Sequence, residues 1–103
     1  MYIQIDHSKL AHSGIHLYGN DDFSIISCNK CKAQYLYDGE SRDIFPNPLD
    51  LKEVYSAFVG DNHQKCKGCN QDMWENKGYT ICDLLDEKIR YGPWAKYLTY
   101  FAI

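Results

Sequence analysis

The fold is decided by the stretch FSIISCNKCKAQYLYDG, which spans residues 23–39. Residues 23–27 and 34–37 are both rich in β-branched and aromatic side chains, a composition that favours strands. Asp38 and Gly39 follow the second run and form a strong turn signal of a β-hairpin. We therefore expect an antiparallel pair of strands, and we expect residues 42–45 to pair back across the turn as a third strand.

Further strand candidates precede this stretch. Residues 2–5 alternate weakly between apolar and polar side chains and are expected to form an edge strand. Residues 14–18 are a second candidate, closed by a cluster of turn-forming residues at 19–22. Together these runs predict a small antiparallel meander.

Two helices are expected after the meander. The first spans about residues 48–59, where Asn47 can cap the helix and Pro48 suits its first position. Its apolar stripe would consist of Leu51, Val54, Tyr55 and Phe58. The second helix spans about residues 80–91, with a stripe made of Ile81, Leu84, Leu85 and Ile89. The tail at residues 94–103 fits both helical spacing and a strand, and both conformations stay open.

The cysteines are the most specific chemical signal in the chain. Four of the five form two Cys-x-x-Cys pairs, and such a pair lets two sulfurs face one ion. Four thiolates are the complement of a tetrahedral Zn²⁺, with Zn–S distances of about 2.3 Å. The sequence therefore predicts one structural Zn²⁺ bound by Cys28, Cys31, Cys66 and Cys69. The fifth, Cys82, is expected to be a buried and inert thiol.

A redox dithiol is the alternative interpretation of each pair. A redox Cys-x-x-Cys opens a helix, whose dipole lowers the pKa of the first thiol. The residues after Cys31 predict a strand instead, which favours metal binding. Thirty-four residues separate Cys31 from Cys66, more than the about 15 to 20 of the common four-thiolate pattern. The helix expected between the pairs accounts for the excess.

The two cysteine knuckles, at residues 26–32 and 65–70, resemble those of the zinc ribbons, in which each knuckle sits at the tip of a β-hairpin. The resemblance covers under half of the chain, and Lys32 and Asn70 stand where a ribbon knuckle usually has glycine. It implies an α+β fold in which a small antiparallel sheet has a zinc-ribbon core. One helix is then inserted between the knuckles (about 48–59) and one follows them (about 80–91). Four protein ligands leave the metal no open position, so the zinc is expected to be structural.

Length and composition bound the class of protein. The chain has 103 residues, of which 45% are hydrophobic and 24% charged. Such values are typical of a globular chain, so residues 1–103 are expected to form a single domain, and bulk disorder is excluded. No apolar run approaches the about 18 residues that a membrane span needs. The start of the chain does not read as a signal peptide, and the odd cysteine count favours a reducing compartment, so a cytoplasmic location is expected.

The function expected first is that of a protein-interaction module, either an adaptor or an inhibitor. The net charge is −3, and no catalytic constellation is recognisable, so enzymatic activity has little support. Tyr97 and Tyr100 are candidate interface residues, because tyrosine is enriched at protein interfaces. A mildly acidic chain would suit a basic partner such as a nuclease toxin, and an immunity-type inhibitor is one version of this hypothesis.

Two alternatives remain open. Lys30, Lys32, Lys65 and Lys67 surround the two knuckles and could form a nucleic-acid-binding rim. Their charges would equally offset the −2 of a zinc bound by four thiolates, which is the interpretation we favour. His7, His12 and His16 could form a second metal site or an acid–base site in a metal-dependent enzyme, although solvated loop histidines are expected instead.

Overall fold

Five strands form the central sheet of the computed structural model, which describes residues 2–15, 22–56, 58–59, 62–63, 65–69 and 78–101. The strands run antiparallel in the order β5-β4-β3-β2-β8. Their bounds are Phe23–Cys28 for β2, Gln34–Asp38 for β3, Asp43–Phe45 for β4, Tyr55–Ser56 for β5 and Tyr79–Ile81 for β8. The strands expected at 23–27, 34–37 and 42–45 are confirmed.

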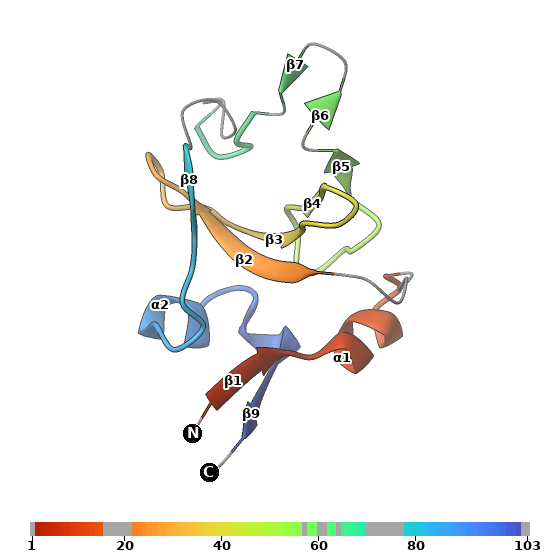
Figure 1. The fold of residues 1–103 in the computed structure, drawn as a ribbon, viewed down its shortest axis with the longest axis vertical. Helices are drawn as coiled ribbons and strands as arrows, with labels where there is room; N and C mark the ends of the chain where they lie inside the picture. The colour runs from red at the N-terminus through yellow and green to blue at the C-terminus, as the bar shows by residue number, and fades with distance from the viewer. Residues whose placement is uncertain are drawn as a thin grey trace.

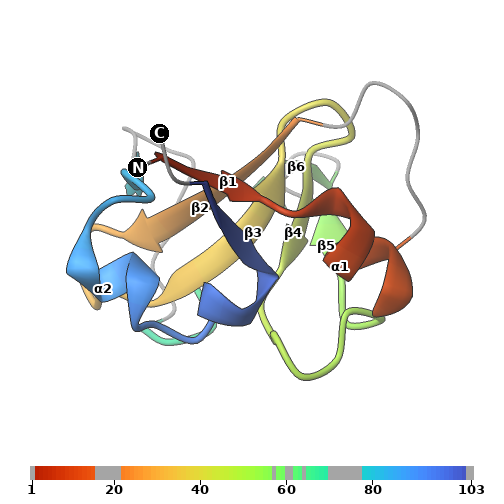
Figure 2. The ribbon, with the colours of Figure 1, turned by 90° about the horizontal axis from the view of Figure 1, so that it is seen from below.

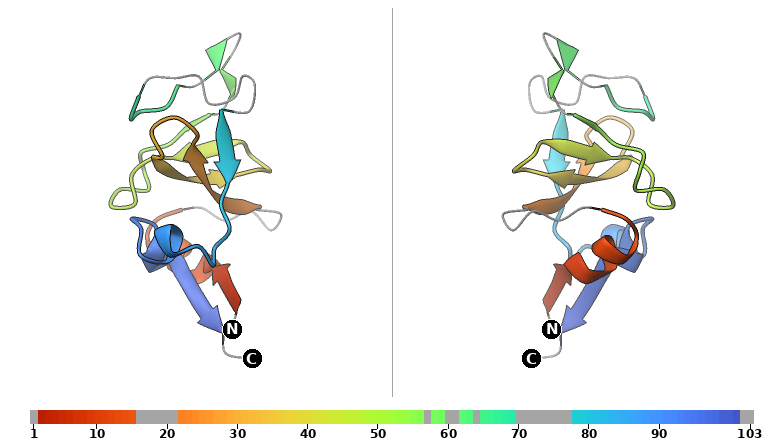
Figure 3. Two further views of the ribbon diagram at one scale, coloured as in Figure 1. Left: turned by 90° about the vertical axis from the view of Figure 1, so that its left-hand side faces the viewer. Right: turned by 90° about the vertical axis from the view of Figure 1, so that its right-hand side faces the viewer.

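The remaining elements lie on either side of this sheet, so the molecule has three tiers (Figures 1 and 3). The upper tier contains the small hairpin of β6 and β7 and the second cysteine pair. The lower tier contains two helices, a 3-10 turn and a two-stranded sheet. The bounds are Phe58–Val59 for β6, Asn62–His63 for β7, Tyr2–Ile5 for β1, His7–His12 for α1, Glu87–Arg90 for α2, Ala95–Tyr97 for η2 and Leu98–Phe101 for β9.

The register of the β2–β3 hairpin assigns its side chains to the two faces of the sheet. Ile25 lies opposite Leu36, and Ile26 lies opposite Tyr35. Because successive side chains of a strand point to opposite faces, the first pair faces the lower tier and the second pair faces the upper tier. All four side chains are at most 2% exposed, so this hairpin contributes to a core on each face.

The lower core is the larger of the two and joins the sheet to the lower tier. Trp94 is fully buried in it, and its Nε1–H donates a hydrogen bond of 3.2 Å to the Gln34 carbonyl oxygen. This bond ties the lower tier to the first residue of β3. The buried members of the lower core are Ile3, Leu10, Ile15, Ile25, Leu36, Phe45, Leu51, Ile89, Trp94, Tyr97 and Leu98.

The two-stranded sheet joins the beginning and the end of the described chain. β1 pairs antiparallel with β9, from Tyr2 opposite Phe101 to Ile5 opposite Leu98. Seen from below, the two strands cross the central sheet between α1 and α2 (Figure 2). The edge strand expected at residues 2–5 is therefore confirmed. The tail is a strand over β9, preceded by one short 3-10 turn.

The helix expected at residues 48–59 is wrong. Turns occupy this region up to Lys52, and Tyr55 pairs with Ile44 as part of β5. Of the expected apolar stripe, Leu51 is buried but Val54 is 45% exposed, so the stripe does not share one buried face. β-Branched and aromatic side chains suit a strand as well as a helix, and β4 offers backbone partners along its edge. Within the segment between the knuckles, β5 therefore extends the central sheet, and β6 and β7 form a separate hairpin.

The helix expected at residues 80–91 is confirmed only for its last turn. Thr80 and Ile81 belong to β8, because they pair with Ser27 and Ile26 of β2. The helix α2 begins after Asp86, whose carboxylate accepts a hydrogen bond of 2.9 Å from the Lys88 N–H. Backbone hydrogen bonding to the edge of the sheet thus determines the conformation of residues 79–81, although the side-chain pattern of this segment favours a helix.

The strand expected at residues 14–18 is also absent from the described part of that range. Gly14 has a φ of 103° in the turn after α1, and Ile15 is buried without belonging to an element. Residues 16–18 lie outside the described residues. The fold class is nonetheless mixed α+β, as expected, with antiparallel sheets. Among the described residues, no helix is long and apolar enough to cross a membrane.

Candidate metal centre

The first knuckle is the tip of the β2–β3 hairpin. Cys28 is the last residue of β2, and Cys31 lies in the turn before β3. The Cys28 N–H donates to the Ala33 carbonyl oxygen, and the Lys32 N–H donates to the Cys28 carbonyl oxygen, both at 2.9 Å. Lys32 has a φ of 66°, so it adopts the left-handed conformation at the position where a ribbon knuckle usually has glycine.

The second knuckle, at residues 65–69, lies against the upper face of the sheet. Cys66 is 1% exposed and packs in the upper core with Ile26, Cys28, Tyr35 and Ile44. The Gly68 N–H donates to the Cys66 sulfur at 3.3 Å. Unlike Lys32, Gly68 has no positive φ. Glycine is favoured at this position because the Cys31 sulfur lies so close to the backbone that an added Cβ would be 3.0 Å from it.

The fold brings the sulfurs of the four predicted cysteines together. All four lie within 4.8 Å of one another. Cys28 Sγ lies 3.6 Å from Cys69 Sγ, and Cys31 Sγ lies 3.4 Å from Cys66 Sγ. Each of these short contacts joins one knuckle to the other, and the four cysteines are free thiols.

These separations fit one tetrahedral metal ion. A disulfide would need an S–S distance of about 2.05 Å. The edge of a tetrahedron around a zinc ion with Zn–S bonds of about 2.3 Å measures about 3.8 Å. The observed contacts are close to that edge, and thiolates are the donors that zinc accepts in structural sites. The four cysteines can therefore hold a metal ion.

The centre is closed on the sheet side and open on one side. Cys28 and Cys66 are buried, Cys69 is half-buried and Cys31 is exposed. The free cysteine Cys82 is half-buried, packs beside the lower core and is not part of this cluster. Exchange of metal and attack by chelators are therefore expected to begin on the Cys31 side.

Two tyrosines beside the centre were missed by sequence reasoning. The Tyr35 hydroxyl shares a hydrogen bond of 3.1 Å with the Cys66 sulfur and accepts a hydrogen bond of 3.0 Å from the Lys67 N–H. Tyr55 on β5 packs against the same cluster, and the Lys67 ammonium lies 5.0 Å from the centroid of its ring. The alternation along β3 could have placed Tyr35 on the face of Cys28, but only tertiary structure brings Cys66 to it.

The surroundings separate the pKa values of the thiols. Burial acts to raise the pKa of Cys66, but hydrogen bonds from the Tyr35 hydroxyl, from knuckle amides and from Cys31 outweigh it and lower this pKa to about 6. At Cys31 a backbone hydrogen bond from Ala33 acts to lower the pKa, but burial and the neighbouring thiols outweigh it and raise the value to about 12. Of these two thiols, Cys66 is therefore the more readily ionised.

The structure also places the residues of the two candidate surfaces. Tyr97 is 4% exposed and donates its hydroxyl to the Pro48 carbonyl oxygen, so it belongs to the lower core and not to a surface. Tyr100 is 44% exposed. The four lysines of the expected rim, Lys30, Lys32, Lys65 and Lys67, are all exposed around the knuckles.

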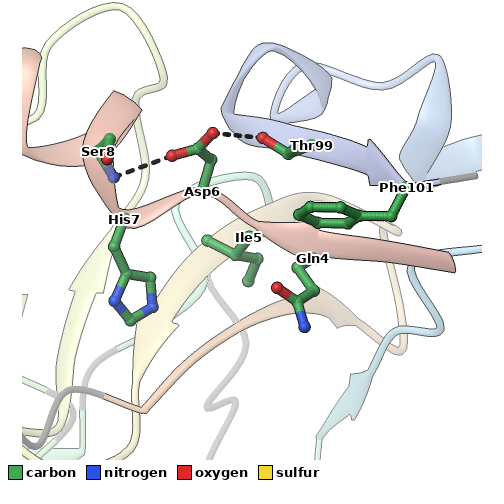
Figure 4. Close-up of a pocket in the computed structure, with 7 residues that line it drawn as sticks. All are labelled: Gln4, Ile5, Asp6, His7, Ser8, Thr99 and Phe101. Carbon is green, nitrogen blue, oxygen red and sulfur yellow. Dashed lines mark hydrogen bonds between the residues drawn. The ribbon is translucent and has the colours of Figure 1, made fainter.

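Of the N-terminal histidines, His7 and His12 are described, and neither belongs to the cysteine cluster. His7 and His12 lie at the two ends of α1, His12 Nδ1–H donates to the Ser8 carbonyl oxygen at 2.8 Å, and His16 lies outside the described residues. A shallow pocket beside His7 is shown in Figure 4. Its most polar group, the Asp6 carboxylate, is engaged by the Thr99 hydroxyl and the Ser8 N–H. Within the described residues, only the four cysteines form a metal-binding cluster.

Comparisons of the chain with protein-family models, with curated proteins and with solved structures found no match.

Proposed function

We propose that Cys28, Cys31, Cys66 and Cys69 bind one Zn²⁺ whose role is structural. The observation that carries this proposal is the pair of short sulfur contacts, Cys28 to Cys69 and Cys31 to Cys66. Each contact joins the tip of the central hairpin to a loop more than thirty residues later in the chain. Zinc bound there would link the upper tier to the sheet, and its four protein ligands would leave no position for a substrate.

The charges around the knuckles support the same assignment. A zinc ion bound by four thiolates carries a net charge of about −2, which nearby cations stabilise. The four exposed knuckle lysines provide those cations. Structural zinc in small domains contributes about 10–16 kcal/mol of binding free energy. This is comparable with a whole domain's stability of about 5–15 kcal/mol, so the metal would decide whether the upper tier is ordered.

Metal analysis by native mass spectrometry tests this proposal. The wild-type chain is expected to bind one Zn²⁺, and Cys66→Ser is expected to lose it. Cys82→Ser is the matched control, because this thiol lies outside the cluster, and it should keep one zinc. Retention of one zinc with normal thermal stability in Cys66→Ser would overturn the proposal, as would a wild-type chain with oxidised knuckle cysteines and no metal.

We further propose that the chain is a protein-interaction module and that its partner docks on the lower tier. Several large apolar side chains are exposed there, on or beside α2 and the β1–β9 sheet: Tyr2, Leu85, Tyr91, Tyr100 and Phe101. The rings of Tyr2 and Phe101 stack at 4.8 Å, and the Arg90 guanidinium lies 5.8 Å from the Tyr91 ring and 5.9 Å from the Tyr100 ring. Such aromatic and arginine side chains dominate protein interfaces. The net charge of −3 favours a partner with a basic surface.

Native mass spectrometry of the chain at its endogenous level tests the interaction. A stoichiometric protein complex that Tyr91→Ala and Tyr100→Ala abolish would support the proposal. Leu49→Ala is the control, because Leu49 is 84% exposed and lies outside this surface. A complex with nucleic acid that weakens steeply with salt and requires the knuckle lysines would favour the nucleic-acid alternative instead.

A further inference from the structure

We propose that Tyr35 is an outer-sphere positioning residue of the metal centre, whose hydroxyl donates a hydrogen bond to the Cys66 sulfur and anchors the second knuckle to the sheet. The inference rests on the proposed metal binding. It adds a residue that belongs to neither knuckle and gives it a defined role at one ligand.

The direction of the hydrogen bond follows from the partners of the hydroxyl. The Lys67 N–H lies 3.0 Å from the Tyr35 oxygen and can only donate, so the oxygen accepts this bond. A metal-bound Cys66 is a thiolate with no proton to donate, so the hydroxyl proton is the one shared with its sulfur, which lies 3.1 Å away. Tyr35 therefore forms hydrogen bonds with two successive residues of the second knuckle, with the sulfur of Cys66 and with the backbone N–H of Lys67.

The sheet holds the hydroxyl in place independently of the knuckle. Tyr35 is 2% exposed and lies in β3, which has a neighbouring strand on each side. Its ring packs with Ile26 and Ile44, which are both fully buried. A tyrosine side chain fixed by such packing has little freedom left, so the geometry at Cys66 is set before any metal arrives.

Such a bond has two consequences for a bound thiolate. It withdraws electron density from the sulfur, which changes the energy of electronic transitions from sulfur to metal. It also holds the ligand in its binding position, so less conformational entropy is lost when the metal binds. Outer-sphere partners of this kind typically change metal affinity by about 10- to 100-fold.

Tyr55 provides a matched comparison within the same cluster. It packs on the same side of the sheet, and its hydroxyl is buried without a hydrogen-bond partner among the described residues. Tyr35→Phe and Tyr55→Phe therefore each remove one buried hydroxyl beside the centre. Only the first removes a hydrogen bond to a ligand.

Titration of the full chain with Co²⁺, followed by competition with Zn²⁺, tests the inference. In Tyr35→Phe the sulfur-to-cobalt charge-transfer band is expected to move to longer wavelength, because the sulfur loses its hydrogen-bond donor. The zinc affinity is expected to fall roughly 10- to 100-fold. Tyr55→Phe is expected to change neither property. A purely structural role of the Tyr35 ring would leave the position of the band unchanged, because the ring is retained in phenylalanine.

The outcomes separate this inference from the proposed function. A wild-type chain that binds neither Co²⁺ nor Zn²⁺ refutes the metal centre itself. A wild-type chain that binds both, together with a Tyr35→Phe variant of equal spectrum and affinity, refutes only the role of Tyr35. If Tyr35→Phe fails to fold, the inference can be tested on the wild-type protein instead. In the wild-type protein loaded with ¹¹³Cd²⁺, the Tyr35 hydroxyl proton should show scalar coupling to the metal, and its resonance without such coupling would overturn the inference.

Discussion

Gly68 of the second knuckle lies so close to Cys31 of the first that an added side-chain carbon would come within 3.0 Å of the Cys31 sulfur. The same carbon would lie 3.4 Å from the Ala33 side chain and 3.6 Å from the Cys66 sulfur. The two knuckles are therefore in contact through a position that has no room for a side chain. This contact lies beside the four sulfurs, which are within 4.8 Å of one another.

Gly68→Ala is expected to weaken metal binding. The new methyl group must push the Cys31 sulfur or the second knuckle away, and overpacking of this kind costs about 1–3 kcal/mol. A cost of this size corresponds to a loss of affinity of roughly tenfold or more, measurable by chelator competition. Gly39→Ala is the control, because the one tight contact of its methyl group would be with the flexible end of the Asp22 side chain, at 3.2 Å. Equal zinc affinity in Gly68→Ala and the wild type would contradict the packing described.

Lys32→Gly is expected to leave the free energy of unfolding unchanged or slightly higher. The φ of 66° costs a non-glycine residue about 1–2 kcal/mol, and glycine removes that strain. Glycine also loses more freedom on folding, which offsets about 0.5–1 kcal/mol of the gain. Lys30→Gly lies in the same turn without a positive φ and should simply lose about 0.5–1 kcal/mol. Urea denaturation of both variants measures the difference. A larger loss of unfolding free energy in Lys32→Gly than in Lys30→Gly would show that Lys32 is not in the left-handed conformation.

Removal of the metal is expected to loosen the upper tier before the rest of the molecule. The second knuckle contacts the sheet mainly around Cys66, whereas the lower core contains eleven buried side chains among the described residues. Amide hydrogen exchange after addition of a chelator should speed up at residues 65–69 and change little at Ile25 and Leu36. Uniform loss of protection along the chain would instead show that the tiers unfold as one unit.

Tyr97→Phe is expected to destabilise the protein, although it removes only one oxygen. The Tyr97 hydroxyl is 2.6 Å from the Pro48 carbonyl oxygen, and its loss leaves a part-buried acceptor without this donor. Such a change costs about 1–2 kcal/mol. Tyr100→Phe should cost little, because this side chain is 44% exposed. Thermal denaturation of the two variants compares them directly, and equal melting temperatures would refute the burial of Tyr97.

The carboxylate of Asp6 is expected to stabilise the fold at neutral pH and to stop doing so in acid. The Thr99 hydroxyl and then the Lys9 N–H lower the pKa of this carboxyl below its value in the unfolded chain, about 3.9. The contribution of Asp6 to stability is therefore complete at pH values above its pKa in the unfolded chain. It is lost as the pH falls through the lower pKa of the folded protein. Urea midpoints of the wild type and of Asp6→Ala should differ at pH 7 and converge in strong acid. A difference independent of pH would contradict the role of the charge.

The sequence predicted three strands of the central sheet, β2, β3 and β4, because their evidence is local. Residues 23–39 contain two β-prone runs and a turn signal, and a hairpin needs no distant partner to form. The edge strand at residues 2–5 was also predicted, but its partner was not, because β9 lies at the other end of the chain. The tail fitted two conformations until pairing with β1 selected the strand.

The two helix predictions show where local pattern is insufficient. Tyr55 and Ile81 fit helical stripes, yet each is part of a strand on the central sheet. Both segments contain side chains that suit either element, and pairing with an edge of the central sheet selected the strand. The same limit hid Tyr35, whose importance depends on a residue 31 positions away.

The sequence by itself determined the chemistry of the candidate site and the hairpin that carries half of it. Two Cys-x-x-Cys pairs specify four soft donors, since this short spacing can be read without knowing the fold. Only the tertiary structure decided that the second pair lies on the sheet, within reach of the first, and which side chains surround the sulfurs. The physical reason is that Cys66 and Tyr35 are buried together on one face of the sheet, with Gly68 close to the Cys31 sulfur beside them, and this arrangement depends on the pairing of strands far apart in the chain.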